Sequence, residues 1–303
     1  MRVCKAIAAS VFLSLLAACG GGGGSSSGFE DEPAPSFAVQ GGGIKGPTTA
    51  ATLTAHSFTL NAGQIVVGAP IGVVPVTSQA NGRALLTVPN SVAVPFLLQS
   101  SGGTDMGTGA APILNPLITI VTQDMLASGA PIFATGLTTL GLQIAAGKAG
   151  SGGIYPDMGD PVLNLLAAMP AASAETLSIA GFGANPGIDI FRQPPLLRNT
   201  DTTQAAQNDV VNYRVANEVL ATVLDALAPG GARALLDELA ADIVDDGAVS
   251  DAAPAAGVRT ALLNAAGTIN AAYLDDVQDD MLAEVNTVGI GTTVNTNYLL
   301  FNP

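Results

Sequence analysis

Cysteine, histidine and tryptophan are almost absent from this chain of 303 residues. There are two cysteines, Cys4 and Cys19, one histidine, His56, and no tryptophan. Hydrolases with a serine or cysteine nucleophile place a base, most often histidine, beside that nucleophile. His56 lies in a segment with strand character, where we expect it at the surface or rim of a sheet. The chain has no S-x-x-K segment and no G-x-x-x-x-G-K-[ST] loop, so we identify no catalytic residue and no cofactor site.

Charged residues are scarce, and most of them are acidic. They make up 11% of the chain, whereas hydrophobic residues make up 48%. Disordered chains combine low hydrophobicity with high charge, so this composition predicts a folded protein. Asp and Glu number 24 against 10 Lys and Arg, which gives a net charge of −14. Such a charge repels phosphate backbones and argues against a nucleic-acid partner, while cations and basic partners remain compatible with it.

The first 18 residues predict a secretory signal peptide. Arg2 and Lys5 form a small cationic head, and an apolar segment from Ala6 to Leu16 follows them. This segment is too short to span a bilayer as a stable helix, which is typical of a cleaved signal. We expect no later segment of the chain to span a bilayer either.

The end of this signal, Leu16-Ala17-Ala18-Cys19, resembles the bacterial lipobox, L-[AS]-[AG]-C. The resemblance implies cleavage before Cys19 and acylation of that cysteine, by palmitate among other chains, so the bilayer becomes a partner. The alternative is an ordinary secretory signal with a chance cysteine. Gly20 follows in place of Asp, which in enteric-type bacteria implies the outer membrane, on its periplasmic or its surface side. No thiol then remains for a disulfide, a nucleophile or a metal site.

Residues 19–36 predict a flexible tether between the lipid and the folded part. Glycine and serine fill positions 20–28, and neither has an apolar side chain to bury. The acidic, proline-containing segment 29–35 extends this stretch.

Residues 37–135 have the sequence pattern of an all-β domain. Short β-compatible runs are broken by glycine, proline and asparagine at close intervals. The clearest strand is predicted at 51–60, and Asn61-Ala62-Gly63 predicts the turn that ends it. Asn81-Gly82 predicts a second turn. Further strands are predicted at 65–67, 73–76, 83–88 and 92–99.

Three segments carry a family resemblance within this domain. They are Gly43-Ile44-Lys45-Gly46-Pro47 with the strand at 51–55, Ser78 to Pro89 around Asn81-Gly82, and Phe96 to Thr104 with its Ser101-Gly102-Gly103-Thr104. Together they resemble carboxypeptidase-regulatory-like (transthyretin-like) β-sandwich domains, which occur near the N-terminus of many bacterial surface lipoproteins. Gln79 and Ala84 stand where that family has Asp and an aromatic residue. The resemblance covers residues 40–105 and implies an architecture but no reaction. Ala134 to Gly141 resembles the segment that opens a helical domain in such lipoproteins.

Residues 136–290 predict an Ala/Leu-rich helical domain, and the tail at 291–303 is expected to be extended. A first helix is expected to start at a cap on Thr138 or Thr139 and to end near Gly147. Asp160-Pro161 predicts the start of a second helix, because proline is favoured at the first helical position. The clearest helical periodicity covers 202–228. Further helices are predicted at 232–244, which Gly247 stops, and at 257–288, which Gly267 interrupts.

Aspartates are the one abundant reactive residue type of the helical domain. Five residues near one helix end have part of the spacing of a calcium loop: Asp242, Asp245, Asp246, Gly247 and Asp251. Val244 and Ala253 occupy positions where such a loop needs oxygen ligands, so we predict a solvated helix end and no metal site. Four more aspartates place like charges on one helix face: Asp275, Asp276, Asp279 and Asp280. They predict a solvated face, with weak cation binding as the alternative.

The expected fold class is α+β multidomain, with a small antiparallel β-sandwich followed by the helical domain. The expected function is a non-catalytic binding or scaffolding role at the bacterial cell envelope, with an envelope protein or a polysaccharide as partner. Two alternatives stay open, namely a carboxylate-dependent hydrolase of envelope or extracellular polymer and a subunit of an envelope complex. Two carboxylates in one buried cleft would favour the hydrolase, and a contiguous exposed apolar patch would favour the subunit.

Overall fold

The computed structural model describes the chain between its two ends, with several internal gaps. The described residues are 36–44, 46–72, 75–80, 82–150, 159–198, 201, 203–250, 257–268, 277 and 279–281. The signal peptide at 1–18, Cys19, the tether up to residue 35 and the tail at 291–303 lie outside these residues. The expectations for those segments therefore stay predictions.

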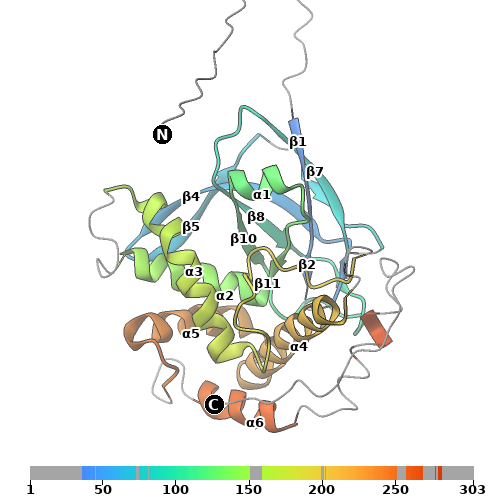
Figure 1. Cartoon of the computed structure of the whole chain (residues 1–303), viewed down its shortest axis with the longest axis vertical. Coiled ribbons are helices and arrows are strands. Elements are labelled where there is room, and N and C mark those ends of the chain that lie inside the picture. The colour runs from blue at the N-terminus through green and yellow to red at the C-terminus, as the bar shows by residue number, and fades with distance from the viewer. Residues whose placement is uncertain are drawn as a thin grey trace, which may run out of the picture. The chain divides into compact units, whose positions relative to one another are not determined.

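The largest sheet is antiparallel and has the strand order β10-β8-β4-β5 (Figure 1). Its strands are β4 (Thr52–Asn61), β5 (Gln64–Pro70), β8 (Phe96–Ser101) and β10 (Leu117–Val121), and the short β6 (Val76–Thr77) also pairs with β4. Leu53 and Ala55 of β4 are buried while Thr52 is exposed, because successive side chains of a strand point to opposite faces. The strand predicted at 51–60 is thereby confirmed.

Three two-stranded ladders complete the strands of the described part. β1 (Ser36–Gly41) pairs antiparallel with β7 (Ala84–Pro89), and β3 (Thr48–Thr49) pairs antiparallel with β9 (Thr104–Asp105). β11 (Ala134–Thr135) pairs with β2 (Gly43–Ile44) in a parallel ladder. The predicted strand at 83–88 corresponds to β7, whose burial alternates as expected of a half-buried strand.

The turn predicted at Asn61-Ala62-Gly63 is confirmed. Asn61 pairs with Gln64, so Ala62 and Gly63 form a two-residue hairpin loop between β4 and β5. Both loop residues have positive φ, 49° and 75°. This conformation matches the right-handed twist of the flanking strands, and glycine adopts it without the steric cost that a side chain carries.

Two expectations for the strand region are wrong in detail. The strand predicted at 92–99 begins only at Phe96, because Pro95 has no N–H to donate to a ladder. The range predicted as all-β also contains a helix, α1 (Gln123–Ser128). Thr122 caps this helix by accepting a hydrogen bond from the Met125 N–H, and Gly129 ends it with φ 64°. These local capping signals outweigh the surrounding strand pattern.

Five longer helices follow, and most of their predicted boundaries are confirmed. They are α2 (Gly136–Gly150), α3 (Pro161–Ala180), α4 (Gln204–Leu227), α5 (Ala232–Asp246) and α6 (Val258–Thr268). Asp160 caps α3 through its side chain, and Gly247 ends α5 with φ 81°. α6 ends at Thr268, one residue after Gly267, and residues 269–276 lie outside the described part, so the remainder of the helix predicted at 257–288 and its interruption stay predictions.

The expected cap of α2 is wrong, and its correction identifies a buried polar network. The helix starts earlier, at Gly136, and Thr135 accepts a hydrogen bond from the Thr138 N–H at 3.1 Å. The Thr138 hydroxyl accepts in return from the Thr135 N–H at 2.8 Å, a reciprocal cap. Tyr213 of α4 joins this network, because its hydroxyl lies 3.0 Å from the Thr135 Oγ1 and donates to the Ile190 carbonyl. Burial raises the pKa of the Tyr213 hydroxyl above its ordinary value.

The described strands and helices share one hydrophobic core. Its buried residues include Leu53 of β4, Leu86 of β7, Leu140 of α2 and Leu220 of α4. Helix α2 contacts the sheet, α3, α4 and α5, and most of its residues are buried. The chain thus combines antiparallel sheets with helices, while the domain boundary at 135/136 stays a prediction.

Among the described helices, α3 has the length and hydropathy that a membrane-spanning helix needs. The bent pair of α4 and α5 passes the same test if the two are taken as one span. We expected no such segment from the sequence. Buried residues of α3 such as Leu165, Ala168 and Leu177 belong to the shared core, and a core helix has the same composition.

Candidate binding site

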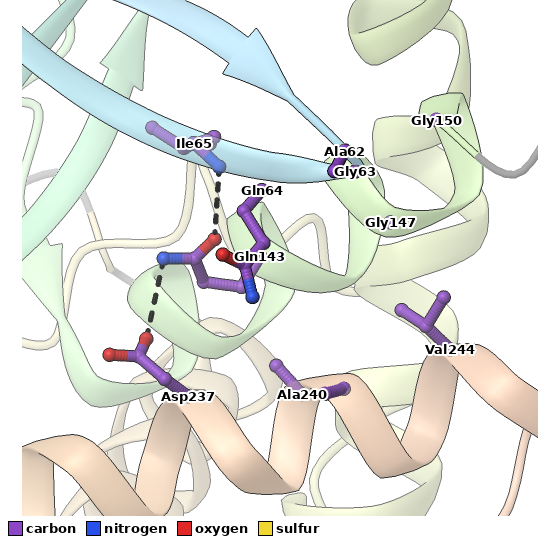
Figure 2. Close-up of a pocket in the computed structure, with 11 residues that line it drawn as sticks. Ala62, Gly63, Gln64, Ile65, Gln143, Gly147, Gly150, Asp237, Ala240 and Val244 are labelled. Carbon is purple, nitrogen blue, oxygen red and sulfur yellow. Dashed lines mark hydrogen bonds between the residues drawn. The ribbon is translucent and has the colours of Figure 1, made fainter.

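A pocket of about 400 Å³ lies where the β4–β5 turn, α2 and α5 meet (Figure 2). The hairpin contributes residues 62–65, α2 contributes Gln143, Gly147 and Gly150, and α5 contributes residues between 237 and 244. We call this cavity the hairpin–helix pocket. Its size falls within the range of small-molecule sites, about 300–1,000 Å³.

Glycines allow the three elements that form the pocket to approach closely. A Cβ on Gly63 would lie 3.3 Å from the Gly147 Cα, so the hairpin loop reaches the backbone of α2. A Cβ on Gly147 would lie only 2.4 Å from the Val244 Cγ2, so α2 and α5 leave no room for a side chain there. The two glycines therefore set how closely the hairpin loop, α2 and α5 approach one another at the pocket.

Gln143 connects the hairpin to α5 across the pocket. Its Oε1 accepts a hydrogen bond from the Ile65 N–H at 3.4 Å, and its Nε2 donates to the Asp237 Oδ1 at 3.3 Å (Figure 2). These two bonds determine which way the amide of Gln143 faces. Because both polar atoms of its amide are held, the Gln143 side chain is preorganised for a ligand and needs little further ordering on binding.

The carboxylate of Asp237 is charge-balanced. Arg233, one helical turn earlier in α5, forms an ion pair with it. The Arg233 Nε also donates to the Pro116 carbonyl at 3.0 Å, which holds the guanidinium beside α5. The pocket therefore carries a carboxylate oxygen without a net local charge.

Gln64 supplies the free polar group of the pocket. It is exposed, and Figure 2 shows its side chain reaching from β5 toward α5. Within the described part of the chain its amide makes no hydrogen bond, so both its donor and its acceptor face solvent. Ala240, Ala241 and Val244 provide an apolar wall on α5. The pocket can therefore accept hydrogen bonds from a small neutral ligand, donate hydrogen bonds to it and pack against its apolar surface.

A larger groove of about 800 Å³ lies beside the first turns of α3. Most of its lining is apolar, and it comes from β4, from the segments after β5 and β7, from β8 and from α3. The apolar lining residues are Phe58, Ile71, Pro89, Val92, Ala93, Val94, Pro95, Phe96, Val162, Leu163 and Leu166. We call this feature the α3 groove. The sequence does not predict this groove, because its walls come from segments that only the fold brings together.

The structure brings together few of the residues that the sequence singled out. His56 lies in β4 as expected, half-buried, with its Nδ1 3.0 Å from the Gly68 carbonyl oxygen. The Asp242 carboxylate accepts from the Ser250 N–H and hydroxyl, both at 2.8 Å, and Asp246 accepts from the Ala248 N–H. These bonds fix the chain where it leaves α5.

The other residues that the sequence singled out are only partly described. Asp279 and Asp280 are exposed, whereas Asp251, Asp275, Asp276 and Cys19 lie outside the described residues. Among the residues that the structure describes, no group of three or more His, Cys, Asp or Glu side chains could hold a metal ion.

Gln64, Gln143 and Asp237, the polar residues of the hairpin–helix pocket, were not identified from the sequence. They are separated by up to 173 positions, and single polar residues in a strand and two helices carry no motif. The glycines Gly63 and Gly147 are the one local signal, since they mark a turn and a close approach.

No protein-family model, curated protein or solved structure matches this chain. The resemblance of residues 40–105 to carboxypeptidase-regulatory-like domains thus stays a prediction from its three sequence segments.

Proposed function

We propose that this chain is a lipid-anchored envelope protein that binds a neutral, hydroxyl-rich ligand, such as a polysaccharide segment, in the hairpin–helix pocket. The observation that carries the proposal is the convergence of Gln64, Gln143 and the charge-balanced Asp237 on one cavity. Sugar hydroxyls both donate and accept hydrogen bonds, and amide and carboxylate groups offer both partners. The apolar wall of Ala240 and Val244 suits the C–H face of a sugar ring.

A neutral ligand fits the charge of the site better than an ionic one. The ion pair with Arg233 already satisfies Asp237, so a cation would have to compete with a neighbouring guanidinium. The net charge of −14 disfavours polyanions through long-range repulsion. Binding energy therefore comes from hydrogen bonds and packing, which predicts modest affinity and weak dependence on salt.

The lipid anchor is supported by Leu16-Ala17-Ala18-Cys19 after an apolar segment and a cationic head. Acylation of Cys19 and location at the outer membrane are parts of this proposal. The tether predicted at 19–36, of which Ser36 already belongs to β1, would hold the pocket away from the bilayer, where envelope polymers are accessible.

The sandwich architecture implied by the family resemblance is also a proposal, and the contacts among its three segments support it. Asp105 follows the Ser101–Thr104 segment, and its Oδ2 accepts from the Gly46 N–H at 3.1 Å. Ser78 donates to the Thr48 carbonyl at 2.6 Å and accepts from the Ala51 N–H at 2.9 Å. Buried residues of the β1–β7 ladder and of the larger sheet also belong to the same core.

The hydrolase and the complex subunit stay as alternative predictions. The test that separates binding from hydrolysis is a titration followed by product analysis. The full chain is titrated calorimetrically with neutral hexasaccharides (maltohexaose, cellohexaose and chitohexaose) and with polygalacturonate as an anionic probe. We expect a neutral sugar to bind and to be recovered intact.

Two variants and one control make this test specific to the pocket. Gln64→Ala removes one hydrogen-bonding side chain and should weaken binding about two- to tenfold, since a neutral hydrogen bond contributes about 0.5–1.5 kcal/mol. Gln143→Ala should weaken it at least as much, because it also releases Asp237. Gln79→Ala, an exposed glutamine away from the pocket, should bind like the wild type. Shortened sugars would support the hydrolase, and binding that ignores both pocket variants would refute the proposed site.

A further inference from the structure

The α3 groove presents an apolar surface to solvent although it lies on an acidic protein. Leu163 of α3 is 51% exposed, and Val162 and Leu166 beside it are half-buried. Val92, Val94 and Pro95 form part of the facing wall and are also half-buried. Concave sites lined mostly by apolar side chains are typical of ligand-binding pockets.

Three polar side chains of the lining, those of Ser57, Thr122 and Asp160, are engaged within the protein, whereas Ser91 and Gln123 are exposed and form no side-chain hydrogen bond within the described part of the chain. Thr122 accepts a hydrogen bond from the Met125 N–H as the cap of α1, and Asp160 accepts from the Val162 N–H at 2.8 Å as the cap of α3. The Ser57 hydroxyl donates to the Ala69 carbonyl at 3.1 Å. Among the described lining residues Asp160 is the one ionisable side chain, and its carboxylate stabilises the N-terminus of a helix. A ligand in the groove therefore meets few free polar partners.

Three backbone positions of the lining offer no free N–H to a peptide. Pro89 and Pro95 have no N–H, and the Val92 N–H donates to the Pro89 carbonyl within the same segment. A bound peptide would bury its own N–H and C=O groups against this wall, and unpaired buried groups cost free energy. An aliphatic chain has no such groups and fits the lining chemistry.

We infer that the α3 groove binds a single aliphatic chain, such as the alkyl part of a fatty alcohol or acyl lipid. Its volume of about 800 Å³ is ample for one chain, and its neutral apolar walls suit methylene groups. Affinity should rise about fourfold for each added methylene until the groove is full, which follows from about 0.8 kcal/mol per buried CH₂. This site is separate from the hairpin–helix pocket and does not depend on the ligand proposed there.

The test uses the full wild-type chain in phosphatidylcholine vesicles and 1-dodecanol that carries a terminal diazirine. After illumination, peptide mass spectrometry locates the adducts. We expect them to concentrate in segments 92–96 and 162–166. Leu163→Asp places a charge on a half-exposed position that tolerates it and should reduce these adducts about tenfold or more, the equivalent of about 1.4 kcal/mol. Val66→Asp, at a 45% exposed position of β5 outside the groove, should leave them unchanged.

A second probe separates a bound chain from contact with the bilayer. Phosphatidylcholine with the same diazirine on its acyl chain leaves the membrane as a monomer far more slowly than dodecanol does. Because dodecanol also partitions into the vesicles, labelling of the groove by this lipid to the same extent as by the dodecanol would mean that the groove faces the bilayer, and it would overturn the inference. Adducts as frequent at Val66 and Val67 as in the groove, or unaffected by Leu163→Asp, would also overturn it. Saturable dodecanol labelling that unlabelled dodecanol displaces better than octanol would support it.

Discussion

The close approach of α2 and α5 at Gly147 gives a prediction about stability. In Gly147→Ala the new Cβ would lie 2.4 Å, 2.7 Å and 3.0 Å from the Cγ2, Cγ1 and Cβ atoms of Val244. Real Cβ atoms almost never come closer than 3.0 Å, so the Val244 side chain or α5 itself must shift. Overpacking of this kind lowers the free energy of unfolding by about 1–3 kcal/mol, whereas replacing a helical glycine with alanine raises it by about 1 kcal/mol. We expect a net loss of up to about 2 kcal/mol in the free energy of unfolding.

The assay is thermal and urea unfolding followed by circular dichroism. For a folded part of this size, 1 kcal/mol corresponds to about 2–4 °C in the unfolding midpoint. Gly267→Ala is the matched control, because Gly267 also lies inside a helix but a Cβ there would meet nothing within 4 Å. The control should be as stable as the wild type or more stable.

A double variant tests the cause of the destabilisation. Val244→Ala removes the two methyl groups that a Cβ at position 147 would meet most closely, so Gly147→Ala should cost much less in that background. Equal stability of Gly147→Ala and Gly267→Ala would refute this explanation. So would an equal loss in the free energy of unfolding on Gly147→Ala in the wild-type and the Val244→Ala backgrounds.

Two further predictions concern the buried tyrosine and the anchor. Burial raises the pKa of Tyr213 in the folded state, so the unfolded state loses the phenolic proton at lower pH than the folded state does. The free energy of unfolding should therefore fall as pH rises above about 10, by up to about 1.4 kcal/mol per pH unit. Tyr213→Phe should lose this part of the slope in urea unfolding at pH 9–11, and an unchanged slope would contradict the burial argument. Cys19→Ala should leave the protein unprocessed or free of the membrane in fractionated cells; a processed variant that stays membrane-bound would contradict the lipid anchor and would direct attention to α3.

Local signals in the sequence account for much of the secondary structure. Thr203 caps α4, Asp160 caps α3 and Gly247 ends α5, each within one or two residues of the predicted boundary. These features depend on neighbouring residues in the chain, so a sequence pattern captures them. The hairpin loop at Ala62 and Gly63 belongs to the same class, because its conformation is set by the loop itself.

Long-range packing accounts for what the sequence did not predict. The start of α2 was misplaced because Thr138 and Thr139 resemble caps, whereas their hydroxyls bond to the Thr135 and Ile118 carbonyls inside a buried network. The candidate site was missed for a similar reason. Gln143 becomes a bridge only when the fold brings Ile65 and Asp237 to its two ends.

The most direct test of the proposed function is a footprint of the hairpin–helix pocket with its ligand bound. Gln64→Cys places a thiol in the pocket, and maleimide labelling at position 64 is followed by mass spectrometry with and without the neutral hexasaccharide that binds in calorimetry. At about ten times the Kd, we expect labelling to slow about tenfold. Val66→Cys, two residues along β5 and outside the pocket, should label at the same rate in both conditions. Unchanged labelling at position 64, or equal slowing at position 66, would contradict the assignment of the ligand to this pocket.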